Sequence, residues 1–196
     1  MNNRIDVEYW ELIWKNFKAG DRDAFKTIYN EFVDALFSYG AKITSDRDLI
    51  KDSIQDLFID VYTYGTALRK PESLEFYLYK ALKRIIIRKL VEKNKHLSVQ
   101  ELREEFDLSF SIEENVFDEE SELFLKKLQE EITHLVPESR ELIFLKFNSG
   151  LTYVEIGQLL DIKPNTAKKQ VYRILDKLRA RIGNEIMVLF RMCWRT

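Results

Sequence analysis

Apolar residues recur at three- and four-residue steps along most of the chain, the period that places side chains on one face of a helix. Three such stripes occupy the first half: Phe25, Ile28, Phe32, Ala35 and Tyr39; Ile50, Ile54, Leu57, Phe58 and Val61; and Leu74, Leu78, Ala81, Leu82 and Ile85. Because amphipathic helices can bury their stripes against one another, this half is predicted to be a helical bundle. Ser45 and Asp48 have capping-box spacing before the second stripe, and a further helix around Trp10 is predicted to pack on the bundle.

The second half has clear signals for helix starts and stops. Pro137 suits the first position of a helix, because its missing amide hydrogen has no helical partner there, and residues 148–150 (Asn-Ser-Gly) end that helix. Thr152 and Glu155 satisfy the capping-box spacing and predict a short helix that ends near residue 161. Pro164 then fits the first turn of another helix. Two short helices joined by a tight turn predict a helix-turn-helix.

The apolar period weakens between about residue 92 and residue 120, where acidic side chains dominate. We therefore predict an all-α protein with two small helical domains, a bundle over residues 1–96 and a helix-turn-helix domain over residues 121–196. An acidic linker over residues 97–120 joins them. The apolar side chains after Gly183 form a C-terminal extension that is expected to cap a core. Six Gly and three Pro are a small supply of turn residues, which disfavours a many-stranded sheet.

Several classes of function are excluded by what the sequence lacks. A single cysteine, Cys193, cannot form an internal disulfide. Together with the two histidines of the chain it gives no spacing typical of metal ligands. The start lacks a signal-peptide pattern, and no apolar run approaches the roughly 20 residues that span a bilayer. There is no catalytic motif and no glycine-rich phosphate loop. We expect a cytoplasmic protein that is not an enzyme, without a cofactor, a metal, a small-molecule substrate or membrane insertion.

Charge is nearly balanced overall, at 31 basic against 33 acidic side chains, but it is unevenly distributed. Residues 163–181 carry seven basic side chains and only Asp176 as an acid, and residues 80–95 carry seven basic side chains and only Glu92. A run of charge often marks nothing more than a solvated helix face. A basic second helix in a helix-turn-helix also suits DNA, because Lys and Arg neutralise the dense phosphate charge of a duplex.

The start and outer face of that second helix carry the candidate DNA-binding residues: Lys163, Asn165, Thr166, Lys168, Lys169, Tyr172 and Arg173. Asn165 is a candidate base reader, because a carboxamide can form two hydrogen bonds with adenine. The alternative for Asn165 is a first-turn polar residue that faces water. For the whole set, duplex DNA binding is favoured over a merely solvated basic helix.

At this point the sequence resembles a known family. The stretch LVPESRELIFLKFNSGLTYVEIGQLLDIKPNTAKKQVYRILDKLRARI is similar to region 4 of bacterial sigma factors, and GDRDAFKTIYNEFVDALFSYG with IKDSIQDLFIDVY is similar to region 2. The order and spacing resemble the extracytoplasmic-function (ECF) group of the sigma-70 family. Asp161 stands where the family often has a turn glycine, and Lys163 where a Ser or Thr cap is usual.

The resemblance implies roles for residues of the first domain. Asp52, Gln55, Asp56 and Ile59 match positions that bind a coiled coil on the largest subunit of core RNA polymerase; without the resemblance they would be read as a solvated helix face. The loop from Tyr64 to Ser73 and the next helix match the part that captures the minus-ten promoter element. The candidates there are Arg69, Lys70, Tyr77, Lys80, Lys83 and Arg84, with Tyr79 as a second stacking aromatic.

The expected function is therefore that of a sigma factor, which directs core RNA polymerase to specific promoters and initiates DNA-templated transcription. Core RNA polymerase and promoter DNA are the expected partners, and the resemblance adds an anti-sigma factor. Two alternatives remain open. The chain could be a stand-alone helix-turn-helix transcriptional regulator, or a protein that mimics a sigma factor and sequesters its partner.

Overall fold

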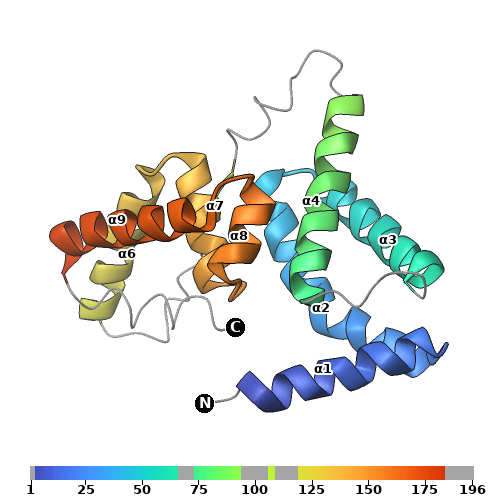
Figure 1. Cartoon of the computed structure of the whole chain (residues 1–196). Coiled ribbons are helices and arrows are strands. Elements are labelled where there is room, and N and C mark those ends of the chain that lie inside the picture. The colour runs from blue at the N-terminus through green and yellow to red at the C-terminus, as the bar shows by residue number, and fades with distance from the viewer. Residues whose placement is uncertain (1–2, 66–72, 94–105, 109–118, 184–196) are drawn as a thin grey trace. The chain divides into compact units, whose positions relative to one another are not determined.

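The computed structural model describes residues 3–65, 73–93, 106–108 and 119–183 (Figure 1). The chain divides into two compact units, Met1–Leu97 and Ser98–Thr196. Within the described residues all regular structure is helical, so the predicted all-α fold class with two helical domains is confirmed. The exact boundaries that we assigned to the domains and linker remain a prediction. The C-terminal extension and the candidates Arg69 and Lys70 lie outside the described residues.

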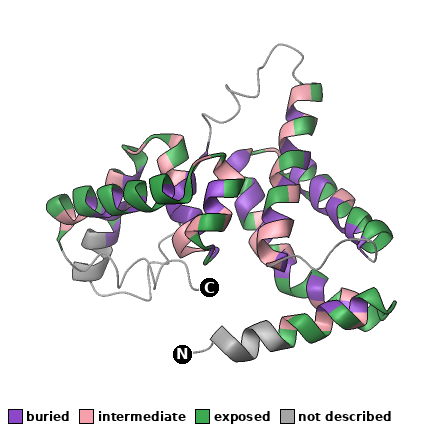
Figure 2. Ribbon diagram, viewed as in Figure 1, coloured by how far each residue is buried: buried purple, intermediate pink, exposed green. Residues whose placement is uncertain are grey.

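The first unit is built from α1 (Asn3–Lys18), α2 (Arg22–Ile43), α3 (Arg47–Tyr64) and α4 (Leu74–Lys93). The apolar stripes of α2, α3 and α4 meet in one core, seen as the purple faces in Figure 2. Ile28, Leu36, Ile50 and Leu82 are all fully buried there. Their three- and four-residue spacing is what places one side chain per turn on the same face, so the bundle follows directly from the pattern.

Helix α1 packs on this bundle through its aromatic side chains, as expected. Trp14 and Phe17 are buried, and the rings of Trp10 and Phe32 lie 5.2 Å apart. Aromatic rings at this separation add a specific contact to the area that they bury. The first helix is thus a structural part of the unit.

The start of α3 differs from the prediction. The N-cap is Asp46, whose Oδ1 accepts a hydrogen bond from the backbone amide of Leu49 at 3.0 Å, so the expected capping role of Ser45 with Asp48 is wrong. Asp46 can also reach α4, where Lys93 Nζ lies 2.7 Å from its Oδ2. The hydrogen bond from Lys93 lowers the pKa of Asp46, and the same contact raises the pKa of Lys93. A carboxylate here therefore caps one helix and ties it to another.

The second unit contains α6 (Glu119–Thr133), α7 (Pro137–Phe147), α8 (Tyr153–Leu160) and α9 (Pro164–Ile182). Pro137 occupies the first turn of α7, and the helix is capped at Asn148, as predicted. Leu128, Ile143, Ile156 and Leu175 belong to the buried core of this unit, one from each helix. The core fixes the orientation of α8 and α9, which carry the candidate DNA-binding surface.

A short piece of the predicted acidic linker is packed on the second unit. Phe106 and Leu108 are almost completely buried, and the ring of Phe106 lies 5.9 Å from that of Phe144 on α7. Arg140 donates a hydrogen bond to the carbonyl of Phe106 at 3.1 Å, and Gln129 donates one to the carbonyl of Leu108 at 3.3 Å. The acidic, weakly periodic sequence of this stretch predicted only a linker, so this contact was not predicted.

Candidate functional site

Helix α8 is capped at both ends. Thr152 Oγ1 accepts a hydrogen bond from the amide of Glu155 at 3.3 Å, and the Glu155 carboxylate accepts one from the amide of Thr152 at 2.7 Å. This confirms the predicted capping box. Asp161 ends α8 in the left-handed region, with φ 59° and ψ 44°. An aspartate tolerates this backbone better than most residues, which explains how it can replace a glycine there.

The turn and the first residue of α9 pack tightly against α8 at Gly157. A Cβ atom at this position would lie 2.7 Å from the carbonyl oxygen of Ile162 and 3.2 Å from the backbone nitrogen of Pro164. The amide of Ile162 also donates to the carbonyl of Gly157 at 2.9 Å. Only glycine leaves room for this contact, so Gly157 sets the tight angle between α8 and α9.

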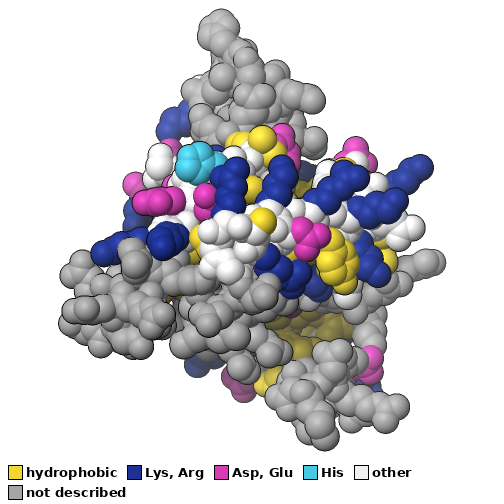
Figure 3. All heavy atoms as spheres, turned by 90° about the vertical axis from the view of Figure 1, so that its left-hand side faces the viewer, with side chains coloured by type: hydrophobic (Ala, Val, Ile, Leu, Met, Phe, Trp, Pro, Cys, Tyr) yellow, Lys and Arg dark blue, Asp and Glu magenta, His cyan; other side chains and the backbone are white. Residues whose placement is uncertain are grey.

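Helix α9 separates a buried face from a basic one. Ala167, Val171, Ile174, Leu175 and Leu178 are buried, as predicted. Pro164 begins the helix, and its N-cap, Lys163, makes no side-chain capping bond. Every candidate on the outer face is exposed: Lys163, Asn165, Thr166, Lys168, Lys169, Tyr172 and Arg173. Figure 3 views the side that α9 occupies in Figure 1 and shows Lys and Arg side chains across it.

Aromatic side chains flank this basic face. Burial raises the pKa of the Tyr153 hydroxyl at the start of α8, and nearby Tyr172 on α9 adds to the shift. Lys146 Nζ lies 4.9 Å from the centre of the Tyr153 ring and donates to the carbonyl of Leu151 at 3.1 Å. Tyr172 is half exposed. The face therefore offers cations for phosphates beside aromatic and polar groups that can contact sugars or bases.

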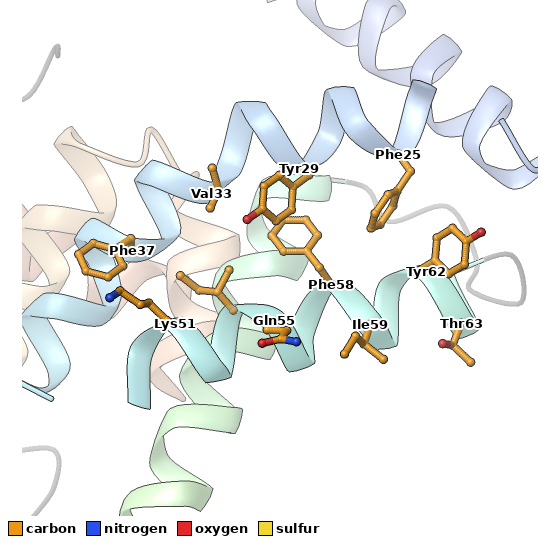
Figure 4. A pocket seen from close by; sticks show the side chains of 11 residues that line it. Phe25, Tyr29, Val33, Phe37, Lys51, Gln55, Phe58, Ile59, Tyr62 and Thr63 are labelled. Carbon is orange, nitrogen blue, oxygen red and sulfur yellow. The ribbon is translucent and has the colours of Figure 1, made fainter. Parts of the chain in front are cut away.

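A second candidate surface is a groove of about 640 Å³ between α2 and α3. Its lining is mostly aromatic and aliphatic, as Figure 4 shows. The lining residues are Phe25, Tyr29, Val33, Phe37, Lys51, Ile54, Gln55, Phe58, Ile59, Tyr62 and Thr63. The Tyr29 and Phe58 rings lie 4.8 Å apart in its middle, and those of Phe25 and Tyr62 lie 5.1 Å apart at one end. Such exposed apolar surface commonly marks a site of protein interaction.

The four candidate polymerase-binding residues lie along the exposed side of α3, opposite its buried stripe, and they differ in their surroundings. Gln55 and Ile59 line the groove, and Ile59 is 53% exposed although it is aliphatic. Asp52 is exposed outside the groove. Asp56 Oδ2 lies 2.7 Å from Lys89 Nζ on α4. The α2 side of the groove was not predicted, because Phe25 was assigned to a core stripe and Tyr29 to no surface.

The described minus-ten candidates lie along α4. Lys80 and Arg84 are exposed, while Tyr77 and Lys83 are partly covered. Burial raises the pKa of Tyr77, and the charge of Asp60 contributes in the same direction. The expectation for Tyr79 is wrong, because its ring is buried in the core 4.9 Å from that of Tyr39. A buried ring cannot stack on a base, so only Tyr77 remains as an aromatic candidate on this helix.

No three His, Cys, Asp or Glu side chains in the part of the chain that the structure describes are grouped so that they could hold a metal ion. None of the helices within the described ranges is long and apolar enough to cross a membrane.

The comparisons with known proteins agree with one another. The family model described as Sigma-70, region 4 matches residues 125–178. The chain is 24% identical to the ECF RNA polymerase sigma factor SigW of Bacillus subtilis, covering 86% of this chain and 94% of SigW. It is 27% identical to the RNA polymerase sigma factor SigV of Bacillus subtilis, covering 79% and 86%. It is 22% identical to the RNA polymerase sigma factor CarQ of Myxococcus xanthus, covering 86% of this chain and 95% of CarQ.

Two solved structures share the fold. CnrH, in complex with the cytosolic domain of CnrY, matches with a TM-score of 0.55 and 16% identity, covering 86% of this chain and 94% of CnrH. The sigma factor RpoE from Bartonella quintana, in complex with the anti-sigma factor NepR, matches with a TM-score of 0.54 and 20% identity, covering 80% and 94%.

Proposed function

We propose that this chain, which belongs to the ECF group of the sigma-70 family, directs core RNA polymerase to specific promoters and initiates DNA-templated transcription. The observation that carries the proposal is the presence of two different binding surfaces on one chain. The first unit has an apolar groove, and the second has a basic helix-turn-helix face. A stand-alone repressor needs only the second.

In this proposal, core RNA polymerase binds α3 of the first unit. Gln55 and Ile59 belong to the groove, so a helix of the polymerase can bury apolar side chains against Ile59, Tyr29 and Phe58. Asp52 and Asp56 lie along the same helix and supply negative charge. Exposed apolar residues beside a few charges give an interface an apolar centre and a polar rim.

The second unit would read duplex promoter DNA through α9. Lys168, Lys169 and Arg173 are exposed and suit phosphates, while Asn165 and Thr166 stand in the first turn, where short polar side chains can reach base edges. On the first unit, the described residues proposed to contact the minus-ten element lie on α4: Tyr77, Lys80, Lys83 and Arg84. Their mixture of cations and a ring suits a single strand.

The remaining parts of the proposal follow from these contacts. The chain acts by binding, and the chemistry of RNA synthesis belongs to the polymerase, so we propose that it is not an enzyme by itself. It would work in the cytoplasm, where core polymerase and promoter DNA are found. Because CnrH and RpoE were solved with CnrY and the anti-sigma factor NepR, we also propose that an anti-sigma factor controls this chain.

A binding experiment with one charge reversal tests the polymerase contact. The fluorescently labelled chain is titrated with purified bacterial core RNA polymerase and followed by anisotropy. We expect saturable binding of the unaltered chain. Asp56→Arg should abolish this binding, because it replaces a negative charge of the proposed interface with a positive charge beside Lys89. Circular dichroism controls for folding. If the folded variant bound as well as the unaltered chain, Asp56 would not be at the interface.

A further inference from the structure

Three carboxylates form a row along α3 at four-residue steps: Asp52, Asp56 and Asp60. Side chains four residues apart on a helix are neighbours, so like charges at these positions repel one another. Asp52 and Asp60 are exposed, whereas the middle carboxylate, Asp56, is about half covered and lies in an ion pair. The middle position of the row thus differs from its two neighbours in exposure.

The cation of this pair is Lys89, which reaches α3 from α4. Its Nζ lies 2.7 Å from Asp56 Oδ2, and only 23% of the lysine side chain is exposed, against 45% of the Asp56 side chain. Salt screens an ion pair that is partly shielded from water less than it screens a fully exposed pair. Lys89 therefore neutralises Asp56 in the free chain, while the carboxylate stays accessible to a binding partner.

We infer that Lys89 competes with core RNA polymerase for Asp56 and thereby sets how tightly this chain binds the polymerase. The inference rests on the proposed function, in which Asp56 supplies negative charge to the polymerase interface. Negative charge on one side of an interface is complemented by positive charge on the other. A cation of the polymerase must either displace the Lys89 ammonium group from Asp56 or lie beside it, and both arrangements cost free energy. Lys89 thus lowers the affinity, although it is not itself proposed to contact the polymerase.

The alternative is that Lys89 only joins α4 to α3 and holds the Asp56 carboxylate in position. The two roles predict effects of opposite sign. If the lysine positions Asp56, its removal weakens binding to core polymerase, whereas if the lysine competes for Asp56, its removal tightens binding. The pair of Lys93 with Asp46 offers a comparison within the same unit. Its two atoms are also 2.7 Å apart and it also joins α4 to the start of α3, but neither residue belongs to the proposed interface.

The test is a titration of the fluorescently labelled full chain with purified bacterial core RNA polymerase, followed by anisotropy at low and at high salt. Lys89→Met removes the charge but keeps an unbranched apolar stem that can cover the same surface. We expect this variant to bind core polymerase about two- to fivefold more tightly at low salt, which is the size of effect that one partly exposed ion pair has. The gain should shrink as salt rises, because salt screens the competing charges.

Lys93→Met is the matched control, because it makes the same change in net charge on the same helix and breaks a pair of the same length. It should bind core polymerase as tightly as the unaltered chain does. Lys89→Arg keeps the cation beside Asp56 and should also bind as the unaltered chain does. Circular dichroism verifies that each variant is folded.

A double-mutant cycle shows whether Lys89 acts through Asp56. Asp56→Asn alone should weaken binding to core polymerase, because it removes a charge of the proposed interface. Adding Lys89→Met to Asp56→Asn should give no gain in affinity, because no carboxylate is left for the lysine to occupy. The gain from Lys89→Met should therefore depend on the presence of Asp56.

The possible outcomes are distinct. If Lys89→Met binds core polymerase no more tightly than the unaltered chain, the inference is wrong, and weaker binding would assign Lys89 the positioning role. It is also wrong if Lys93→Met, or Lys89→Met together with Asp56→Asn, shows the same gain, because the lysine then acts only through net charge. If the unaltered chain does not bind core polymerase at all, the proposed function itself has failed, and this inference fails with it.

Discussion

The groove between α2 and α3 and the basic face of α9 are proposed to bind their partners in opposite ways. The groove offers Ile59, Tyr29 and Tyr62 as exposed apolar surface, and its neighbour Asp56 is already paired with Lys89 at 2.7 Å. On α9, the exposed Lys168 and Lys169 have no ion-pair partner among the residues that the structure describes. One surface depends on shape and apolar burial, and the other on unneutralised charge.

This difference predicts two kinds of recognition. Apolar burial responds weakly to salt, while contacts with phosphates release counterions and weaken steeply as salt rises. We therefore expect the affinity for the protein partner to change little over a range of salt concentrations in which the affinity for DNA falls steeply. The Asp56–Lys89 pair also lowers the local charge of α3, so the protein contact is expected to be the less electrostatic of the two.

After the charge reversal at Asp56, the largest expected effect comes from placing a charge in the groove. Ile59→Arg should weaken binding to core polymerase by about a hundredfold or more, because the new cation would be buried against aromatic rings at the centre of the interface. Titration of the labelled variant measures the affinity. Leu12→Arg is the matched control, since Leu12 is also an exposed aliphatic residue, at 56%, but lies on α1 outside the groove. Equal affinities for the two variants would exclude the groove as the polymerase site.

A smaller but more specific effect is expected on α9. Lys168→Ala with Lys169→Ala should reduce the slope of log affinity against log salt by about two, because each lost phosphate contact removes about 0.9 from the slope. Binding of a promoter duplex is measured across a salt series. The matched control is Lys126→Ala with Lys127→Ala, an adjacent and exposed lysine pair on α6. If the two double variants change the slope equally, the lysines of α9 contribute only to the overall charge of the protein and do not contact phosphates.

The geometry of the helix-turn-helix can be tested apart from its charge. Gly157→Ala should destabilise the second unit by about 1–3 kcal/mol, because the added Cβ would meet the carbonyl oxygen of Ile162 at 2.7 Å. Chemical denaturation measures the loss, and Gln158→Ala, at the next and exposed position of α8, should change stability by less than about 0.5 kcal/mol. DNA affinity should fall with Gly157→Ala while polymerase affinity stays the same. A parallel loss of both affinities would contradict the division between the two surfaces.

The smallest effect concerns the tie between α3 and α4. Asp46→Asn keeps a capping side chain but removes the pair with Lys93. Because the folded pKa of Asp46 lies below its ordinary value of 3.8, the pair contributes stability above that value and loses it as pH falls through the lowered pKa. The difference in unfolding free energy between the two proteins should therefore be constant near neutral pH and vanish in acid. A difference that persists in acid would mean that the cap, and not the ion pair, is responsible.

Much of the fold could be predicted because its signals are local. The stripes of α2 to α4, the Thr152–Glu155 capping box and the starts of α7 and α9 at proline all depend on residues within a few positions of one another. The sequence could not show that Tyr79 is buried. Tyr77 and Tyr79 both lie at the edges of the apolar stripe of α4, and the pattern alone does not indicate which edge faces the core. The exact N-cap at Asp46 was missed by one residue, since Ser45 and Asp46 are both good caps.

The features that were missed are those made by residues far apart in the sequence. The groove is formed where Phe25 and Tyr29 of α2 pack against Tyr62 and Phe58 of α3. No rule of residue spacing within one helix predicts contacts between two helices. The packing of Phe106 depends on its contacts with Phe144 and Arg140, which lie more than 30 residues later in the chain. Composition marked that region as acidic and weakly periodic, which concealed two buried apolar residues within it.

The most direct test of the proposed function is run-off transcription with purified core polymerase and this chain on a library of genomic fragments. We predict discrete start sites that require the chain, share a two-part upstream motif and disappear with Ile59→Arg. Tight duplex binding by the intact chain, with neither new start sites nor association with core polymerase, would contradict the account and indicate a stand-alone DNA-binding regulator.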